Sequence, residues 1–288
     1  MFSAQVWVSI FVNTLTMASM YIMAALGFAF IFNMLGTINL AHGSIYMISA
    51  YLMYAFFAYV GLPTWLSLLI TTIVMAGFGF LLERFAIRPF QADFDRIIMV
   101  GVALMTIMST TATLISGTKQ LSIPSFATGQ YQSGIFVVSK EKLVMFIIGL
   151  IILAIVLFIV NKTKLGKQMK AVSQDRTGAA LQGIPIYKVA GIVCAIGCAI
   201  AAIAGGLMGA YQGLSTGMGD TINLRILMLV LLAGAGSMNG IIVTGLIMAF
   251  LDSFFPVIVQ GTMASALALL VVIILLLIKP KGFFGHEV

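Results

Sequence analysis

Apolar runs long enough to cross a membrane follow one another along almost the whole chain, with short polar segments between them. The runs Leu143–Val160, Val189–Met208 and Met263–Ile278 contain no charged residue. A helix needs roughly 20 apolar residues to cross a hydrocarbon core about 30 Å thick, and the shorter runs reach that length with their flanks. The runs do not alternate with period two, as the strands of a transmembrane barrel do. The pattern predicts an all-α polytopic membrane protein.

We predict nine candidate spans, with no linker or separate soluble domain between them, so that residues 1–288 form a single domain. Glycines interrupt two of these segments, and an interrupted segment can re-enter the membrane without crossing it. We therefore expect about eight or nine transmembrane helices, two of them interrupted. The candidate spans are 8–32, 42–60, 63–82, 97–116, 143–160, 189–211, 222–236, 238–259 and 262–278.

The charges of the chain are few, and their placement predicts its orientation. Charged residues make up 8% of the sequence, whereas about 25% of a soluble domain is charged. The net charge of +7 would suit a nucleic-acid partner, but basic residues in a membrane protein mark the cytoplasmic side of the bilayer. We therefore expect a lipid bilayer and no nucleic acid as the partner of these surfaces.

Eleven of the fifteen Lys and Arg residues fall in segments 83–96, 161–188 and 279–288, which face one side when the chain crosses nine times. An external N-terminus is therefore predicted, with the 161–188 loop and the C-terminus in the cytoplasm. The eleven residues are Arg84, Arg88, Arg96, Lys162, Lys164, Lys167, Lys170, Arg176, Lys188, Lys279 and Lys281.

The stretch "NMLGTINLAHGSIYM", residues 33–47, interrupts the apolar pattern in the first third of the chain. A helix break at membrane depth leaves backbone groups unpaired, and it survives only where protein or a water-lined cavity surrounds it. We predict that the helix breaks at Gly36 and Gly43, and that Asn39 and His42 add side-chain hydrogen-bonding groups. These four residues are candidates for a substrate pathway, and close helix packing through glycine is the alternative.

A second interruption, "LLAGAGSMNGII", occupies residues 231–242 in the last third of the chain. Gly-interrupted segments in corresponding places of two halves point to the translocation site of a transporter. Gly234, Gly236 and Ser237 are therefore pathway candidates, but glycine-mediated packing explains this stretch equally well.

Isolated polar residues within the spans have more than one interpretation. Asp252 lies in the eighth span, where an ionisable group lines a pathway or pairs with another helix, and both readings stay open. Arg225 and Asp220 are expected to form an interfacial pair at the outer end of the seventh span. Cys194 and Cys198 lie four residues apart in one apolar helix, and we interpret them as packing residues because two thiols make no metal site.

The cytoplasmic stretch 161–188 predicts a short amphipathic helix. Leu165, Met169 and Val172 follow the i, i+4, i+7 spacing of one helix face, and Pro185 limits the extension of the helix. A solvated loop needs no apolar stripe, so the pattern favours a helix that docks on a partner. No phosphate-binding loop of the form G-x-x-x-x-G-K-[ST] occurs in the sequence, and "KLGKQMK" lacks its first glycine and its final hydroxyl. The chain is therefore predicted not to be an enzyme.

Five stretches together resemble one family of membrane proteins. They are "GTINLAHGSIYMISAY", "ERFAIRPF", "LGKQMKAVSQDRTGAALQGI", "AGAGSMNGIIVTGLIMAFLDS" and "IKPKGFFG", in this order along nearly the whole chain. The chain resembles the permease subunits of branched-chain amino-acid ABC transporters, specifically the first type of the heteromeric pair. It departs from the usual family pattern at Ala233 and Ala235, where glycines are usual, at Asp252, where Glu is usual, and at Arg225, where Lys is usual.

The resemblance implies a function, a location and a set of partners. It implies a multi-pass permease in the bacterial inner membrane that imports branched-chain amino acids, together with a second related permease, two ABC ATPase subunits and a periplasmic or extracellular solute-binding protein. ATP and Mg would be bound by the ATPases, so this chain needs no cofactor and no metal. The 161–188 loop corresponds to the family's coupling helix, and the residues implied to meet the ATPase are Gly166, Met169, Val172, Asp175, Arg176, Ala179 and Gly183.

Three other functions stay open at this point. The same architecture serves importers of urea, short amides and small organic acids. An ion-coupled secondary transporter would need ionisable relays inside several spans, and this chain offers mainly Asp252. A membrane assembly subunit that does not transport would use the broken helices for packing alone.

Overall fold

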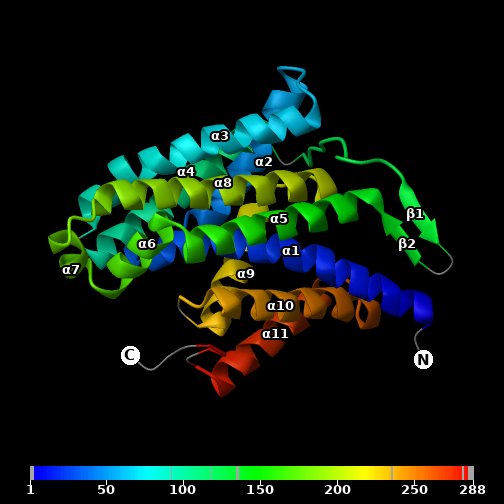
Figure 1. The fold of residues 1–288 in the computed structure, drawn as a ribbon. Helices are drawn as coiled ribbons and strands as arrows, with labels where there is room; N and C mark the ends of the chain where they lie inside the picture. Colours follow the sequence, from blue (N-terminus) through cyan, green and yellow to red (C-terminus); the bar gives the residue numbers. More distant parts are fainter. Residues whose placement is uncertain are drawn as a thin grey trace. The chain divides into compact units, whose positions relative to one another are not determined.

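The computed structural model in Figure 1 describes residues 3–91, 93–117, 119–133, 136–234, 236–280 and 282–284. These residues fall into two compact units, each assembled from separate stretches of the sequence. Unit 1 comprises Met1–Ala25, Ser125–Ile151 and Arg225–Val288, and unit 2 comprises Leu26–Pro124 and Ile152–Leu224. The helices α1 (Ala4–Leu35), α5 (Lys140–Lys162) and α9 (Met218–Ala233) each begin in one unit and end in the other. The prediction of one domain stays a prediction.

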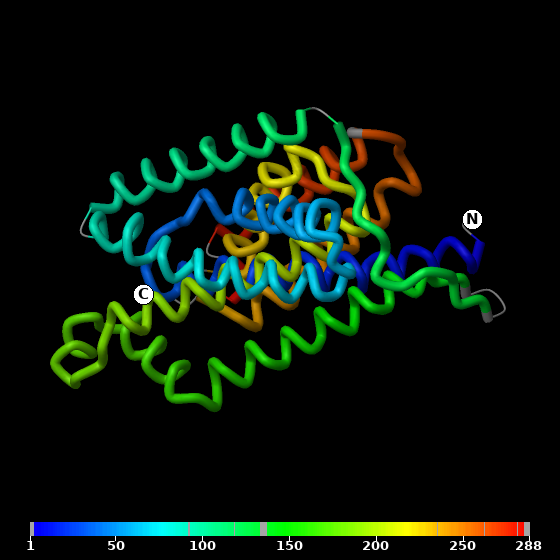
Figure 2. Tube along the Cα trace, turned by 90° about the horizontal axis from the view of Figure 1, so that it is seen from above, coloured from blue at the N-terminus to red at the C-terminus, as the bar shows by residue number. Residues whose placement is uncertain are grey.

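Unit 2 is built around α8. Its helices are α2 (His42–Ala58), α3 (Thr64–Leu82), α4 (Phe94–Ser116), α6 (Lys164–Gln174), α7 (Arg176–Leu181) and α8 (Ile186–Gln212). A five-residue π-helix, Glu83–Ile87, and a 3₁₀ turn, Arg88–Phe90, extend α3. In Figures 1 and 2, α3 lies alongside α8, and the two helices are in contact.

Small residues allow the helices of unit 2 to approach closely. A Cβ atom added to Gly79 of α3 would lie 2.5 Å from the carbonyl oxygen of Cys194 and 2.8 Å from the Sγ atom of Cys198. Both cysteines are free thiols and fully buried. This confirms that they are packing residues, because glycine at the contact lets two helix backbones approach to a distance that any side chain would prevent.

Unit 1 contains an antiparallel hairpin and the C-terminal helices. Strands β1 (Gln130–Ser133) and β2 (Phe136–Ser139) pair with Gln130 opposite Ser139 and Tyr131 opposite Val138. This hairpin lies between the fourth and fifth predicted spans, 97–116 and 143–160. The helices α10 (Met238–Ile258) and α11 (Thr262–Ile278) are in contact with each other.

The structure confirms an all-α polytopic membrane protein. Among the described residues, six helices are long and apolar enough to cross a membrane: Ala4–Leu35, Thr64–Phe90, Phe94–Ser116, Lys140–Lys162, Ile186–Gln212 and Met238–Ile258. A shorter apolar helix covers Met263–Ile278. Every predicted span overlaps one helix, but α2 and α9 have only 17 and 16 residues. At 1.5 Å per residue they are roughly 25 Å long, so the number of complete crossings stays a prediction.

Candidate functional site

The first interruption is a true break between two helices. The helix α1 ends at Leu35 and α2 begins at His42. Gly36 has φ of 68°, a left-handed conformation that glycine adopts without steric cost, and its N–H donates to the carbonyl of Phe32 at 2.8 Å. The break therefore occupies residues 36–41, as the sequence predicts for Gly36.

Gly43 has a different role from the predicted one. It is the second residue of α2, so the break ends just before Gly43 and not at it. A Cβ atom on Gly43 would lie 2.3 Å from the carbonyl oxygen of Gly219, at the start of α9. The glycine is required because the two helix backbones touch at this point, and the sequence pattern did not distinguish this contact from a break.

The register of α2 on α8 places the first break near the middle of a long helix. Cβ atoms added to Gly205 and Gly209 of α8 would lie 2.2 Å from the carbonyl oxygen of Tyr46 and 2.9 Å from the Cβ atom of Ala50. Both contacts advance by four residues, so the two helices run parallel in one register. Extended by four more residues, this register places His42 opposite Ala201 of α8. At 1.5 Å per residue, Ala201 is about 22 Å from the start of α8 and about 17 Å from its end. The His42 end of the break therefore lies near mid-height of a helix that is long enough to span the membrane.

Asn223 of α9 holds the first break by two hydrogen bonds. Its Nδ2 atom donates to the carbonyl of Leu40 at 2.9 Å, and its Oδ1 atom accepts from the N–H of Gly43 at 3.3 Å. Asn223 is buried, with 7% of its surface exposed. One amide side chain thus satisfies a carbonyl and an N–H that the break releases. The sequence analysis missed this residue, and an asparagine within an apolar segment was the available signal.

The other predicted side chains of the break are also buried. The Oδ1 atom of Asn39 accepts from the N–H of Ala41 at 3.1 Å, while the Asn39 Nδ2 atom has no hydrogen-bond partner among the described residues. His42 is fully buried, and its ring meets the ring of Phe28 edge to face at 5.7 Å between centroids. Asn39 and His42 are therefore both enclosed by protein at the α2 end of the break.

The second interruption is also a break, closed by backbone hydrogen bonds. The helix α9 ends at Ala233, and Gly234 and Gly236 have φ of 89° and 88°. The hydroxyl of Ser237 then caps α10 by accepting from the N–H of Gly240 at 3.0 Å. Ala235 lies outside the described residues.

The C-terminal segment of unit 1 returns to the end of α9. The N–H groups of Phe283 and Phe284 donate to the carbonyls of Leu232 and Ala233 at 2.8 and 3.1 Å. These are carbonyls of the last helical turn, which otherwise lack partners. A Cβ atom on Gly282 would lie 2.5 Å from the Gly234 nitrogen, so only glycine fits there. Backbone groups of the C-terminal segment thus satisfy the carbonyls that the second break releases.

Arg225 of α9 and Asp252 of α10 form a compact group with Tyr21 in unit 1. Arg225 Nη1 lies 2.7 Å from Asp252 Oδ2, and the Tyr21 hydroxyl donates to the same oxygen at 2.8 Å. The Arg225 guanidinium also stacks over the Tyr21 ring at 5.2 Å. The predicted pairing of Arg225 with Asp220 is therefore wrong. Residues five apart in an α-helix are turned by about 140°, so Asp220 and Arg225 face different directions.

The stretch 161–188 folds as two helices where one was predicted. Asp175 is extended and caps α7 by accepting from the N–H groups of Thr177 and Gly178 at 2.9 and 3.0 Å. Thr163 caps α6 in the same way, through the N–H of Gly166 at 3.2 Å. Capping by Asp and Thr is strong enough to start a helix, and an amphipathic pattern does not show the restart.

The apolar stripe of this stretch is covered by the chain itself. Met169, Val172 and Ala179 are each about 95% buried, and α6 and α7 both contact α8. A Cβ atom added to Gly166 would lie 2.2 Å from the carbonyl oxygen of Val160, so only glycine fits there. Gly183, after α7, has φ of 79°. The side chains open to a partner are instead on the other face, among them Leu181, which is 85% exposed. The apolar stripe therefore packs α6 and α7 against the rest of the permease fold and is not free to contact a partner.

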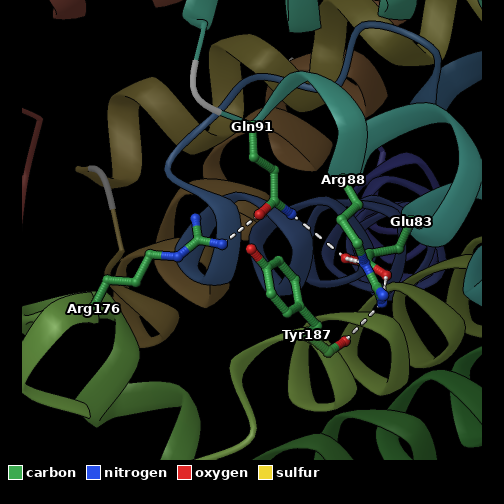
Figure 3. Close-up of polar contacts among 5 residues, drawn as sticks. All are labelled: Glu83, Arg88, Gln91, Arg176 and Tyr187. Atoms are coloured by element: carbon green, nitrogen blue, oxygen red, sulfur yellow. Dashed lines mark hydrogen bonds and ion pairs between the residues drawn. The ribbon is translucent and has the colours of Figure 1, made fainter. Parts of the chain in front are cut away.

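A polar cluster joins α7 to the ends of α3 and α8 (Figure 3). Arg176, the first residue of α7, donates through Nη2 to Gln91 Oε1. Gln91 Nε2 donates to Glu83 Oε1 at 3.5 Å, and Arg88 Nη2 forms an ion pair with Glu83 Oε2 at 2.7 Å. The Arg88 guanidinium also lies 4.8 Å from the centre of the Tyr187 ring. Gln91 and Tyr187 were not among the predicted residues.

These features coincide with a match to a known family. The family described as the branched-chain amino acid transport system permease component matches residues 10–278, which include both breaks and the α6–α7 segment. The chain belongs to this family. It is a permease of the branched-chain amino-acid ABC transporter family.

Relatives match the permease over almost its whole length. The high-affinity branched-chain amino acid transport system permease protein BraD of Pseudomonas aeruginosa is 26% identical, with 96% of this chain and 94% of that protein covered. The corresponding protein LivH of Escherichia coli is 27% identical, with 95% and 94% covered. In fold, the permease is similar to a chain of PsaBC from Streptococcus pneumoniae, with a TM-score of 0.52, 14% identity, and 94% and 92% of the two chains covered.

Proposed function

We propose that the permease is the membrane subunit of an importer that carries branched-chain amino acids across the bacterial inner membrane. The observation that carries this proposal is the family match across residues 10–278. The names of BraD and LivH, whose alignments cover 96% and 95% of this chain, support this substrate class. Small polar solutes such as urea or short amides are the second candidate, because the substrate-selecting component of such a system is a separate chain.

The first break is the proposed point of the substrate pathway. Gly36, Asn39, His42 and Gly43 lie at or beside it, and His42 lies near the middle of the length of α8. A pathway has to bind its solute weakly so that the solute can leave, and neutral hydrogen-bonding groups provide weak binding. In the structure Asn223 bonds to the Leu40 carbonyl and the Gly43 N–H, and the Asn39 Oδ1 atom accepts from the N–H of Ala41. We infer that the hydrogen bonds of this break exchange partners when the pathway opens. For Gly234, Gly236, Ser237 and Asp252, the contacts in unit 1 favour a supporting role.

The face of α6 and α7 that points away from α8 is the proposed contact with an ATPase. Met169, Val172 and Ala179 fix the segment to the permease, Asp175 begins α7, and Gly166 and Gly183 allow its tight packing and turn. The side chains available outside include Leu181 and the lysines of α6. This face and the C-terminus belong on the cytoplasmic side by charge distribution, although residues 285–288 lie outside the described residues.

The partners follow from the same reasoning. A second related permease completes the membrane core, two ABC ATPases bind and hydrolyse ATP with Mg²⁺, and an external solute-binding protein delivers the substrate. The permease sequence contains no phosphate-binding loop, so the energy has to come from other chains. The permease itself needs no cofactor.

Uptake by reconstituted vesicles tests this proposal. The permease, its partner permease and the two ATPases are placed in liposomes with ATP on the ATPase side and binding protein on the other. We expect uptake of radiolabelled leucine only when all components and ATP are present, and competition by isoleucine and valine. Uptake by the permease alone would contradict the dependence on partners. Uptake of urea without leucine would reject the substrate and leave the family assignment intact.

A further inference from the structure

The end of α3 is irregular, and the irregularity brings two charged residues together. Glu83–Ile87 form a π-helix, and the N–H of Arg88 donates to the carbonyl of Glu83. In a π-helix residues i and i+5 are hydrogen-bonded, so they lie one above the other, whereas in an α-helix they diverge. The Arg88 side chain therefore reaches back to Glu83, with Nη2 to Oε2 at 2.7 Å and Nε to Oε1 at 3.2 Å.

Glu83 is a fully buried carboxylate, and both of its oxygens accept hydrogen bonds. Its side chain has no exposed surface, whereas that of Arg88 is 31% exposed. A buried carboxylate is costly unless it is paired and hydrogen-bonded. Arg88 supplies the positive charge that pairs with this carboxylate, and Gln91 Nε2 donates to Glu83 Oε1 at 3.5 Å. Glu83 is thus a fixed anchor point at the end of α3.

Gln91 is the link between this anchor and the α7 helix. Its Oε1 atom accepts from the Arg176 guanidinium, and its Nε2 atom donates to Glu83 (Figure 3). An amide carries both a donor and an acceptor, which lets one side chain join a cation on one side to a carboxylate on the other. Glutamate at position 91 would repel Glu83, and lysine or arginine would repel Arg176.

Tyr187 adds the start of α8 to the same cluster. Its backbone carbonyl accepts from Arg88 Nη2 at 3.3 Å. Its ring lies 4.8 Å from the Arg88 guanidinium and 6.0 Å from that of Arg176. The cation–π contacts place both arginines on one aromatic side chain. The ends of α3, α7 and α8 are therefore joined by side chains as well as by the chain.

We propose that Gln91 is a positioning residue that passes movement of α7 to α3 and α8 during the transport cycle. The inference rests on the proposed contact of α6 and α7 with an ATPase. The α3 and α8 helices touch at Gly79, so they move as a pair, and α8 carries α2 and the first break in its register. Movement of α7 can reach the break through its direct contact with α8, and the Arg176–Gln91–Glu83 chain adds a link from α7 to α3.

The ratio of ATP hydrolysed to solute transported, measured with the complete complex in vesicles, tests this proposal. Gln91→Leu removes both hydrogen bonds, and we expect the ratio to rise about tenfold, since bonds to charged groups are the strong ones, while complex yield and ATP hydrolysis persist. The matched control is Gln120→Leu, which removes one glutamine bond, to the Gln212 carbonyl at 3.0 Å, away from this cluster. The control should keep the wild-type ratio. A wild-type ratio in Gln91→Leu would overturn the proposal.

Two further variants keep the test decisive if Gln91→Leu assembles poorly. Gln91→Glu places a second carboxylate beside Glu83 and should raise the ratio. Arg176→Leu breaks the same chain at its other end, leaves the Glu83–Arg88 pair intact, and should raise the ratio to a similar extent. A wild-type ratio in both variants would overturn the proposal. Absence of ATP-driven transport in the wild-type complex would reject the proposed function. Normal transport in wild type with an unchanged ratio in Gln91→Leu would reject only the role of Gln91.

Discussion

The break between α1 and α2 and the break between α9 and α10 look alike in the sequence, since both combine glycines with small polar residues. In the structure they are held by different bonds. Side chains, chiefly those of Asn39 and Asn223, satisfy the first break. Backbone groups of the C-terminal segment satisfy the second. A side-chain amide can change partners by rotating, whereas backbone pairing requires a segment to detach. The first break is therefore suited to opening and the second to support.

The largest effect is expected from removing the side chain that holds the first break. Asn223→Leu leaves the carbonyl of Leu40 and the N–H of Gly43 without this partner in a buried site. Each unsatisfied group costs about 1–3 kcal/mol, so we expect a loss of about 4 kcal/mol in the free energy of unfolding, and loss of transport. Denaturant unfolding in micelles measures the first quantity and vesicle uptake the second.

Thr221→Val is the control for this variant. Thr221 is exposed two residues earlier on α9, and its hydroxyl bonds only to the carbonyl of Gly217, at 3.1 Å, among the contacts described. We expect a change of less than about 0.5 kcal/mol and normal uptake. Equal stability of Asn223→Leu and Thr221→Val would show that Asn223 does not hold the break.

A smaller effect, of a different kind, is expected at the second break. Gly282 has φ of 77°, and an added Cβ atom would lie 2.5 Å from the Gly234 nitrogen. Gly282→Val should therefore detach the C-terminal segment from α9 and lower the free energy of unfolding by about 2 kcal/mol.

Transport per assembled complex should be retained in this variant, because the second break is proposed to support and not to conduct. Yield, thermal unfolding and uptake normalised to complex separate the two effects. If Gly282→Val abolished uptake at normal yield, the two breaks would have to be given the same role.

The sequence was enough to predict the helices and the first break. It was not enough to predict which residues cap, cover or bond to them. Long apolar runs set the spans because the bilayer fixes the length of a crossing helix. The restart of the helix at Asp175 was missed because a local cap overrode the amphipathic pattern. The burial of Met169 and Val172 was missed because a stripe looks the same whether its own chain or a partner covers it.

Residues that act through distant partners were also beyond the sequence. Arg225 was assigned to Asp220, its neighbour in the chain, although its partner Asp252 lies on another helix. Asn223 and Gln91 were not singled out, since each has a role only through residues that folding brings to it. Periodicity predicts which face of a helix is apolar, whereas hydrogen-bond partners depend on tertiary packing.

Transport by Asn39→Leu and His42→Leu tests most directly the claim that the first break borders the pathway. Thr244→Val is the matched control, because it removes a buried hydroxyl in unit 1 that bonds to the carbonyls of Gly240 and Leu229 at 2.8 and 3.2 Å. In vesicles containing equal amounts of complete complex, both break variants should lose at least about tenfold of leucine uptake and still bind the ATPases, while Thr244→Val transports normally. Normal uptake by Asn39→Leu and His42→Leu at unchanged complex yield would contradict the claim and leave the break as a packing device.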